Sequence, residues 1–447
     1  MRTLCLILQL HQPFRLKRYH FFDIGRDGYY YDDFKNKSIL RKAAEQSYLP
    51  TNALLLELIK QHGEQFKVSL SLSGTVLDQL EIYAPEVIES FQALAQTGQV
   101  EFLSETYGHS LASLTHPEEF AYQVRLHARK INRLFGQSPR VFRNTEMVYN
   151  DRLGEEIARL GFEAVLTEGA DHVLGWRSPH FVYFNPLAPK LKVLLRHYPL
   201  SDDIAFRFSD RSWNAWPLTT EKYAAWINSL SPQDKLLNLV LSYETFGTLH
   251  QADSGIFDFL RYLPPALHRD SDFRLATLSE ALQKYSPKAP LAVPDTISWA
   301  DAEKDLTAWL GNEMQDEAFE KLYKLRPLIE HLDDKALKRD WMYLQTSDHF
   351  YYMSTKFQAD GEVHNFFNPY ESPYEAFINY MNVLSDFILR LEKALPPDPA
   401  DRILLDNGSP EELEMLVAKS QALLAQWPVK PVPTAKETVP NESPLLK

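Results

Sequence analysis

The decapeptide "NLVLSYETFG", residues 238 to 247, joins an apolar run to a polar cluster. The run "LVL" at 239–241 is typical of a buried strand, and "YET" at 243–245 falls where that strand ends. Ser242 lies between the two parts, where a chain with acids at its other strand ends is expected to offer a second carboxyl group. This strand, and other stretches of the chain that share its pattern, decide the fold class and the chemistry that we expect.

Six other stretches repeat the strand pattern and alternate with segments of helical periodicity. The strand-like stretches are "TLCLILQLH" (3–11), "FKVSLSLSG" (66–74), "VEFLSETYG" (100–108), "RVFRNTE" (140–146), "EAVLTEG" (163–169) and "LKVLLRHYPL" (191–200). Helical periodicity covers 49–62, 76–96, 117–135, 151–160 and 220–230. Strands that are apolar on both faces and separated by helices predict a buried parallel sheet. About seven such units favour a closed or nearly closed β/α barrel over an open sheet.

Polar and reactive side chains gather at the carboxyl ends of these predicted strands. They are His11, Ser73, Glu105, Glu146, Glu168, Asp202 with Asp203, and Ser242 with Glu244. In a parallel β/α barrel the carboxyl ends of the strands form one rim, and active sites lie there. A strand that runs into a loop explains polar residues at its end, but it does not require so many acids and so few lysines. The pattern therefore predicts a functional site on this rim.

The pattern changes after "YSPKAPLAVPDTISWA" (285–300), whose three prolines indicate a linker or a surface crossing. Beyond it, the segments 302–315, 317–330, 334–354 and 373–394 are all expected to be helices. We therefore predict a barrel domain at 1–290 and a helical domain at 300–395, or to about 427 in the longest assignment, that packs on the barrel. The Pro-rich, polar tail at 428–447 is predicted to be disordered.

The composition is that of a globular protein with ample material for a core, since 45% of the 447 residues are hydrophobic and 24% are charged. The formal net charge of −13 argues against nucleic acid or an anionic membrane surface as a partner, and a neutral substrate fits it. Cys5 is the single cysteine, so neither an intrachain disulfide nor a cysteine-based metal cluster can form.

The N-terminus imitates the start of a secretory signal, because Arg2 lies just before the apolar run "LCLILQL" (4–10). That run is short, no small-residue cleavage site follows it, and "HQPFRLKRYH" (11–20) is strongly polar and basic. A buried first strand is the better interpretation. No run approaches the ~20 apolar residues that a membrane span needs, and we expect a cytoplasmic protein.

The segment "FRNTEMVYN" (142–150) places Glu146 where a strand ends, before a helix that opens near Asp151. A carboxylate on the rim of a barrel can act as a nucleophile or as a general base. A helix-capping role, or an ion pair with neighbouring Arg143, explains the same residue without any catalysis. Both interpretations stay open at this point.

The segment "GQVEFLSETYGHSL" (98–111) carries Glu101, Glu105 and His109. If the chain is extended from 100 to 105, Glu101 and Glu105 point to the same face, and acids on an inward face need partners or a substrate. An ion pair between Glu105 and His109, four residues apart, is the structural alternative. Together with His11 they form a weakly spaced set that could hold a divalent metal, which is a further alternative.

Other reactive residues have structural explanations beside functional ones. His11 ends the first predicted strand, and a lone histidine is more often a satisfied core residue than a ligand. Asp203 lies four residues before Arg207, so a loop ion pair competes with substrate binding. Asp348 and His349, within "DWMYLQTSDHFYYMST" (340–355), fit core packing on one side of a helix and the rim of a cleft on the other.

Five motifs occur in order along the chain: "HQP" (11–13), "GQVEFLSETYGHSL" (98–111), "FRNTEMVYN" (142–150), "SYETFG" (242–247) and "LQTSDHFYYM" (344–353). Together they resemble family 57 of the glycoside hydrolases, and within it the α-amylase and amylase-like group. The resemblance runs from about Arg2 to near Leu391, so it covers most of the chain. Five separated motifs in the right order are far more specific than any one of them.

The resemblance implies a seven-stranded, incomplete TIM-like β/α barrel followed by a helical region that completes a cleft. It also implies action on α-glucans with retention of anomeric configuration, and Glu146 matches the nucleophile. The positions that match the family's substrate site, together with Asp203 from the rim, are the expected substrate-binding residues. They are His11, Glu101, Glu105, His109, Asp203, Asp348 and His349.

One position departs from the family. Its acid/base is an aspartate that opens a "DYETFG" type of motif, and Ser242 stands there in this chain. Retaining glycosidases need two carboxyl groups, commonly ~5 to 5.5 Å apart. A serine hydroxyl is too weakly acidic to replace one of them, and loss of positioned acid–base help costs ~10²- to 10⁴-fold in rate. Glu244, two residues on and on the same strand face, is the nearest substitute, although the family already has a glutamate there.

Three hypotheses follow. The first is an active, retaining α-glucan hydrolase or 4-α-glucanotransferase-like enzyme, with Glu146 as nucleophile, Ser242 at the acid/base position and Glu244 as the substitute acid. The second is an amylase-like protein that binds an α-glucan or maltooligosaccharide and has lost most turnover. The third is a metal-dependent hydrolase that uses His11 and His109. The sequence gives no reason to expect an organic cofactor.

Overall fold

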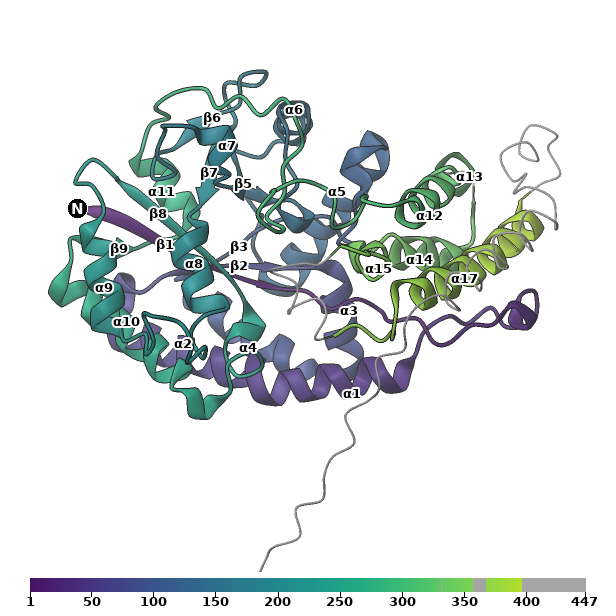
Figure 1. The fold of residues 1–447 in the computed structure, drawn as a ribbon, viewed down its shortest axis with the longest axis horizontal. Coiled ribbons are helices and arrows are strands. Elements are labelled where there is room, and N and C mark those ends of the chain that lie inside the picture. Colours follow the sequence, from purple (N-terminus) through teal and green to yellow (C-terminus); the bar gives the residue numbers. More distant parts are fainter. Residues whose placement is uncertain (331, 357–366, 396–447) are drawn as a thin grey trace, which may run out of the picture. The chain divides into compact units, whose positions relative to one another are not determined.

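The computed structural model describes residues 1–330, 332–356 and 367–395 (Figure 1). Seven parallel strands follow one another in the order β3-β2-β1-β8-β7-β5-β4. These are β1 Arg2–Leu10, β2 Val68–Leu72, β3 Val100–Phe102, β4 Val141–Arg143, β5 Ala164–Glu168, β7 Lys192–Arg196 and β8 Leu236–Ser242. Each lies within one of the seven stretches predicted as strands or starts one or two residues before it. The predicted seven-stranded, incomplete β/α barrel is therefore confirmed.

The two ends of this strand path meet next to the site. An isolated parallel bridge joins Ser104, just beyond β3, to Phe142 of β4. The Ser104 amide donates to the Val141 carbonyl at 3.1 Å, and the Arg143 amide donates to the Ser104 carbonyl at 2.8 Å. This short bridge brings the segment after β3 beside the segment after β4, so the rim residues of the two strands become neighbours.

Two further strands were not predicted. β6 Tyr183–Phe184 pairs antiparallel with β7, and β9 Phe273–Leu275 pairs parallel with the start of β1. Both are too short to show a periodic pattern. Every residue of β1 and β8 is buried, because side chains point alternately into the barrel and toward the covering helices. The register places Ser242 opposite Gln9 at the carboxyl end of this central pair.

Helices cover the outside of the sheet (Figure 1). They are α1 Asp33–Ala43, α2 Leu49–His62, α3 Gly74–Tyr83, α4 Pro85–Gln96, α5 Pro117–Phe135, α6 Asp151–Arg159, α7 Asp171–Leu174, α8 Tyr198–Ala205, α9 Thr220–Ser229, α10 Ile256–Asp270 and α11 Leu278–Lys284, with a π turn at Ala44–Tyr48. The helix expected at 76–96 is two helices. Ala84 leaves the helical conformation (φ −150°, ψ 60°) because the following Pro85 disfavours it.

The C-terminal helices are α12 Glu313–Tyr323, α13 Arg326–Glu330, α14 Lys335–Leu344, α15 Ser347–Tyr351 and α17 Pro373–Ala394. The helix expected at 302–315 is wrong before residue 313, where the chain makes turns and Asp301 and Lys304 have left-handed φ values of 52° and 54°. The helix expected at 334–354 breaks at Thr346, which forms an antiparallel bridge with Ser110 of the barrel. These helices and the barrel share one apolar core cluster.

The segment 285–300 is irregular, as expected for a crossing, but it is bonded to the barrel. Tyr149 and Ile297 exchange backbone hydrogen bonds of 3.0 and 2.9 Å, and the Phe184 amide donates to the Ala289 carbonyl. A domain boundary at 290–300 stays a prediction. The expected extension to 427 and the tail at 428–447 lie outside the described residues. Within the residues that are described, no helix combines the length and apolar character required to cross a membrane.

Candidate active site

Glu146 lies directly after β4, in the short 3-10 turn Thr145–Met147, and its side chain is fully buried. Its φ of 52° is left-handed, as are those of Met147 (55°) and of His109 (49°) after β3. Such values are uncommon for residues other than glycine and often occur at functional sites. The backbone therefore turns sharply at two adjacent points of the rim and holds Glu146 and His109 toward each other.

Three groups from distant parts of the chain bond the Glu146 carboxylate. His109 Nε2 lies 3.0 Å from Oε1, Ser347 Oγ donates to the same oxygen at 3.4 Å, and Trp299 Nε1 donates to Oε2 at 2.5 Å. The Trp299 amide also donates to the Glu146 carbonyl at 3.2 Å. Donors on both oxygens fix the orientation of the carboxylate and favour its ionised form.

Behind His109 lies a buried chain of alternating charges. His109 Nδ1 is 3.1 Å from Glu105 Oε1, and Arg143 Nη1 donates to Glu105 Oε2 at 3.2 Å. Burial alone would raise the pKa of Glu105, but the bond and charge of His109 and the charge of Arg143 lower it to about 2. Burial alone would lower the pKa of His109, but its bonds to Glu105 and Glu146 raise it to about 9. A cationic His109 donates from both nitrogens, one to each carboxylate.

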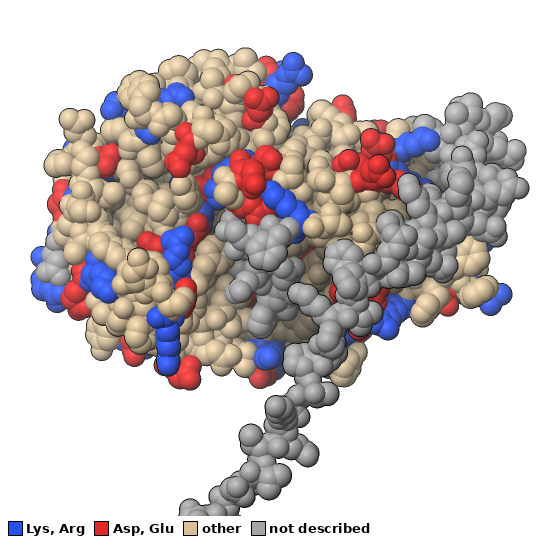
Figure 2. All heavy atoms as spheres, viewed as in Figure 1, with Lys and Arg blue, Asp and Glu red and all other residues tan. Residues whose placement is uncertain are grey.

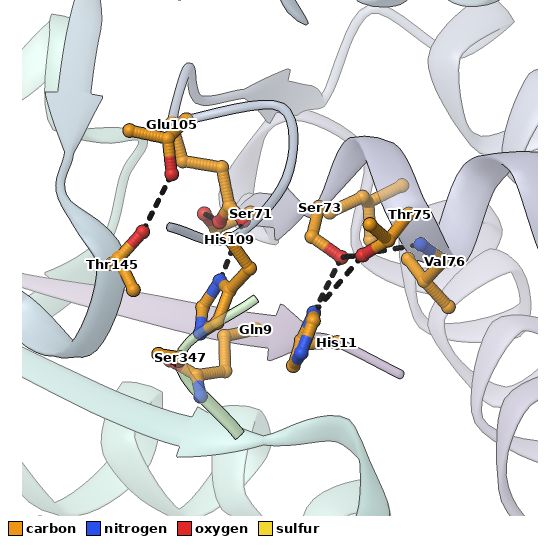
Figure 3. Close-up of polar contacts among 12 residues, drawn as sticks. Gln9, His11, Ser71, Ser73, Thr75, Val76, Glu105, His109, Thr145 and Ser347 are labelled. Carbon is orange, nitrogen blue, oxygen red and sulfur yellow. Dashed lines mark hydrogen bonds and ion pairs between the residues drawn. The ribbon is translucent and has the colours of Figure 1, made fainter. Parts of the chain in front are cut away.

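His11 reaches the same space from the end of β1. Its Nδ1 is 2.7 Å from Ser73 Oγ and its Nε2 is 2.8 Å from Asp348 Oδ2. Its ring stacks on His109 with a centroid distance of 3.8 Å, and Figure 3 shows the two imidazoles with their partners Ser73 and Glu105. Burial and the neighbouring His109 lower the pKa of His11. A neutral His11 therefore lies against a cationic His109, and Asp348 ties the helical region to the barrel rim.

Ser242 and Glu244 form a second buried cluster at the end of β8. Ser242 Oγ donates to Glu244 Oε2 at 2.5 Å, while Tyr48 Oη and Gln12 Nε2 donate to Oε1 at 2.7 and 3.1 Å. Burial raises the pKa of Glu244 although these hydrogen bonds oppose the shift. No cation takes part in the hydrogen bonds that the described residues make to this carboxyl group, so its protonated form is favoured more than that of Glu146.

A cavity of about 30 Å³ joins the two clusters. It is lined by Gln9, His11, Gln12, Pro13, His109, Glu146, Ser242, Glu244, Trp299, Asp348 and Phe367. The tertiary structure thus brings the expected nucleophile, the serine at the acid/base position and its nearest carboxyl neighbour to one space. The carboxyl groups of Glu146 and Glu244 both line this cavity.

Four expected site residues do not line this cavity. Glu105 does not reach the cavity wall; it is bonded to His109, which does. Glu101 is in the body of β3, where its carboxylate accepts from Ser69 Oγ at 3.0 Å and from the Ser279 amide at 3.2 Å. β3 ends at Phe102, but the strand pairing continues at Ser104 through its bridge to Phe142. Glu101 and Glu105 accept from Ser69 and Ser71, whose side chains point to the same face of β2, in line with the expectation that both acids share one face.

Asp203 and His349 also have partners of their own. Asp203 lies on α8 and pairs with Arg207 at 2.5 Å, as the ion-pair alternative predicts. His349 is buried, and its Nε2 bonds the Tyr343 carbonyl at 3.2 Å. The two residues therefore satisfy their polar groups outside the cavity that holds Glu146.

Sequence reasoning missed several residues that line the cavity or bond Glu146. Trp299 lies in the segment taken for a linker, and an isolated tryptophan in an irregular, Pro-rich stretch carries no signal of a catalytic neighbour. Gln12 could have been found, because it lies inside the "HQP" motif. Ser347 directly precedes Asp348 and enters the site only because the chain breaks at Thr346, where the Ser347 amide donates to the His109 carbonyl at 2.9 Å.

The metal alternative finds no support in this geometry. Within the part of the chain that the structure describes, no three His, Cys, Asp or Glu side chains form a group that could hold a metal ion. The ring nitrogens of His11 and His109 are already bonded to Ser73, Asp348, Glu105 and Glu146. A metal at this point would have to replace those bonds.

Comparison with known proteins agrees with the motifs. The family model described as glycosyl hydrolase family 57 matches residues 5–294. A relative from Methanocaldococcus jannaschii, named "Putative alpha-amylase", is 40% identical over 410 residues, which are 88% of this chain and 86% of the relative.

Two solved structures share the fold. A GH57 branching enzyme from Thermococcus kodakaraensis superposes with a TM-score of 0.63 at 14% identity, over 94% of each chain. A 4-alpha-glucanotransferase from Thermococcus litoralis superposes with a TM-score of 0.62 at 17% identity, over 89% of this chain and 60% of the other. The fold, the match of the family model and the identity to the archaeal relative lead to one conclusion: this chain is a member of glycosyl hydrolase family 57.

Proposed function

We propose that this protein is a retaining glycosidase or glucanotransferase that acts on an α-glucan or maltooligosaccharide. One observation carries the proposal: Glu146 and Glu244 line the same cavity, and their surroundings favour opposite protonation states. Pairs of carboxyl groups that are kept in different protonation states are the usual acid and nucleophile of this chemistry. On the face seen in Figure 2, acidic and basic side chains are interspersed, which suits a neutral polymer.

In the first step, Glu146 attacks the anomeric carbon and forms a glycosyl ester. The donors from His109 and Trp299 hold its carboxylate in one orientation, and the cationic His109 keeps it ionised before the attack. The chain from Arg143 through Glu105 in turn keeps His109 protonated. These residues position the nucleophile and do not transfer a proton to the leaving group.

The departing sugar needs a proton, and Ser242 cannot be its source because a hydroxyl is far too weak an acid near neutral pH. Glu244 fits this role because burial raises its pKa. Its Oε2 is 2.5 Å from Ser242 Oγ, so a protonated Glu244 can donate to the serine oxygen while the serine hydroxyl donates to the glycosidic oxygen. In the second step the same pair takes a proton from water or from an acceptor sugar.

A second candidate function is α-glucan binding with little turnover. It is favoured by the three donors on Glu244, from Ser242, Tyr48 and Gln12, because they leave this carboxyl group well bonded within the protein. In that case Glu146 keeps its role in forming a glycosyl ester only with substrates whose leaving group needs no proton.

Two substrates separate these functions. Maltoheptaose requires a proton on its leaving group, whereas 2,4-dinitrophenyl α-maltoside does not. Comparable turnover of both supports the Glu244–Ser242 pair as acid, and turnover of the aryl glycoside alone supports the binding protein. Glu146→Gln is expected to abolish turnover of both substrates, and retention is checked by NMR of the first product. Full activity on maltoheptaose in Glu146→Gln would overturn the proposed function.

A further inference from the structure

A second hollow lies outside the catalytic cavity and shares none of its lining residues. It is a groove between α3, α5 and α14 with a volume of about 500 Å³. Small-molecule sites commonly measure roughly 300 to 1,000 Å³. Tyr107 forms one wall and lies two residues before His109, so the groove is on the other side of the loop that carries part of the active site.

The two acids of the groove are already neutralised within the protein. Asp78 accepts from the hydroxyls of Tyr107 and Tyr343 at 2.6 and 3.0 Å and from Lys130 Nζ at 2.6 Å. Glu81 accepts from Lys130 at 2.6 Å and from Arg133 of α5 at 2.9 Å. Their charges and lone pairs are therefore largely committed, and they offer little to a ligand.

The cations on the opposite wall are not committed in this way. Lys335, Lys338 and Arg339 are exposed on α14, at the i, i+3 and i+4 positions that share one helix face. In the part of the chain that the structure describes, neither lysine makes a hydrogen bond or ion pair through its ammonium group, and Arg339 has Asp340 at 3.6 Å. In a chain of net charge −13, this wall is a local site for an anion.

The floor of the groove is apolar and partly open. Tyr122 and Ile82 are 46% and 61% exposed, and Leu126 and Met342 lie beside them. A half-exposed tyrosine offers a flat face on which a sugar or a base can stack. The groove therefore combines a surface for a ring with a cationic wall.

We propose that this groove binds a small phosphate ester built on a ring, the chemistry that sugar phosphates and nucleotides share. The phosphate contacts Lys335 and Lys338, and the ring lies on Tyr122. A neutral glucan fits less well, because the groups left free to bind it are cations and the acids that would accept its hydroxyls are occupied. The proposal does not depend on the reaction assigned to Glu146.

Calorimetric titration of the full chain tests it, with glucose 1-phosphate and AMP as the two probes and with inorganic phosphate and maltotriose as comparison ligands. The double variant Lys335→Glu with Lys338→Glu is expected to weaken ester binding by about tenfold or more. Tyr122→Ala is expected to weaken ester binding severalfold and to leave phosphate binding unchanged.

The double variant Lys37→Glu with Lys42→Glu reverses two exposed charges on α1 and serves as the matched control. Glu146→Gln is expected to bind the esters normally, which locates them outside the catalytic cavity.

Tighter binding of glucose 1-phosphate identifies the ligand class as sugar phosphates, and tighter binding of AMP identifies it as nucleotides. The absence of ester binding at millimolar concentrations overturns the proposal, as does equal weakening by the control variant. Equal affinity for inorganic phosphate, unaffected by Tyr122→Ala, shows a plain anion patch and removes the ring from the assignment. Binding of maltotriose in the groove, unaffected by the charge reversals, replaces the anionic ligand with a neutral one.

Discussion

The two carboxyl groups of the cavity are held in opposite ways. Glu146 faces the cationic His109, and behind it an acid and an arginine continue a buried line of charges. Glu244 faces two hydroxyls and an amide, all of them neutral. A neighbouring cation stabilises a carboxylate, whereas burial among neutral donors favours the protonated acid. In the proposed mechanism, one end of the cavity therefore serves the nucleophile, and the other keeps a proton although serine stands at the expected acid/base position.

The backbone differs between the two ends as well. Glu146 and His109 have left-handed φ values after short strands, so their positions depend on turns that the surrounding structure holds. Ser242 ends the seven-residue strand β8, in register with Gln9 of β1. We therefore expect the position of Glu146 to depend more on its partners than the position of Ser242 does.

The largest effect is expected from Glu146→Gln, which removes the proposed nucleophile. We expect the rate on any α-glucoside to fall by roughly 10⁴-fold or more, because the group that forms the ester in the proposed mechanism is lost. Initial rates on maltoheptaose and on an aryl α-maltoside measure the loss, and calorimetry with maltoheptaose should show retained binding. A variant that keeps a tenth of the wild-type rate would assign the nucleophile elsewhere.

Ser242→Asp tests the end of the cavity that holds Ser242 and Glu244. If Ser242 occupies a disabled acid position, a carboxyl group there should raise turnover of unactivated glucan by about 10²- to 10⁴-fold. The aryl glycoside should gain much less, because its leaving group needs no proton. Glu244→Gln in the same assay is the control and should reduce the wild-type rate on maltoheptaose. An unchanged rate in Ser242→Asp means that serine is not a missing acid, and a loss of rate in Glu244→Gln then assigns the proton to the Glu244–Ser242 pair.

Removal of the Trp299 indole N–H, which donates to Glu146, should have an intermediate effect. Trp299→Phe loses one hydrogen bond to a charged group, which corresponds to roughly ten- to a hundredfold in the rate of ester formation. It should also move the acidic limb of the pH–rate profile upward, since the carboxylate loses a donor that favours its ionised form. Trp176→Phe, at a side chain that is 95% exposed, is the matched control. A lower rate with an unmoved limb would indicate damage to packing alone.

The charge of His109 should make stability depend on pH. Its folded-state pKa of about 9 lies above the ordinary value of 6.5. The contribution to the free energy of unfolding, on the order of 3 kcal/mol, is therefore fully present below pH 6.5 and is lost as pH rises through about 9. Urea unfolding at several pH values measures the slope, and His109→Gln should flatten it over this window. An equal slope in both proteins would place the titrating group elsewhere.

Asp203→Asn should have the smallest effect. Asp203 is on the rim in the sequence pattern, but its carboxylate pairs with Arg207 outside the cavity. We expect glucan affinity and turnover within about twofold of wild type, because the contribution of a single ion pair outside the cavity is small. A tenfold rise in KM would show that Asp203 contacts substrate in spite of this pair.

Much of the fold was predictable because its elements are locally encoded. The longest parallel strands, β1 and β8, are largely apolar runs. The helices α2, α5 and α17 carry an uninterrupted helical period, so they begin and end where the sequence predicts. Elements that depend on distant partners were missed. β6 and β9 are two and three residues long and exist only as neighbours of β7 and β1. The break at Thr346 follows from its bridge to Ser110.

The sequence by itself determined the fold class and the set of residues at the rim, because strand and helix periods are local and parallel strands end on one side. It also singled out Glu146, His109 and His11 before their contacts were known. Only the tertiary structure decided what touches Glu146 and Glu244. Trp299 lies 153 residues from Glu146, and Tyr48 lies 196 residues from Glu244. Contacts of that span depend on how the chain crosses the rim, and no local pattern encodes them.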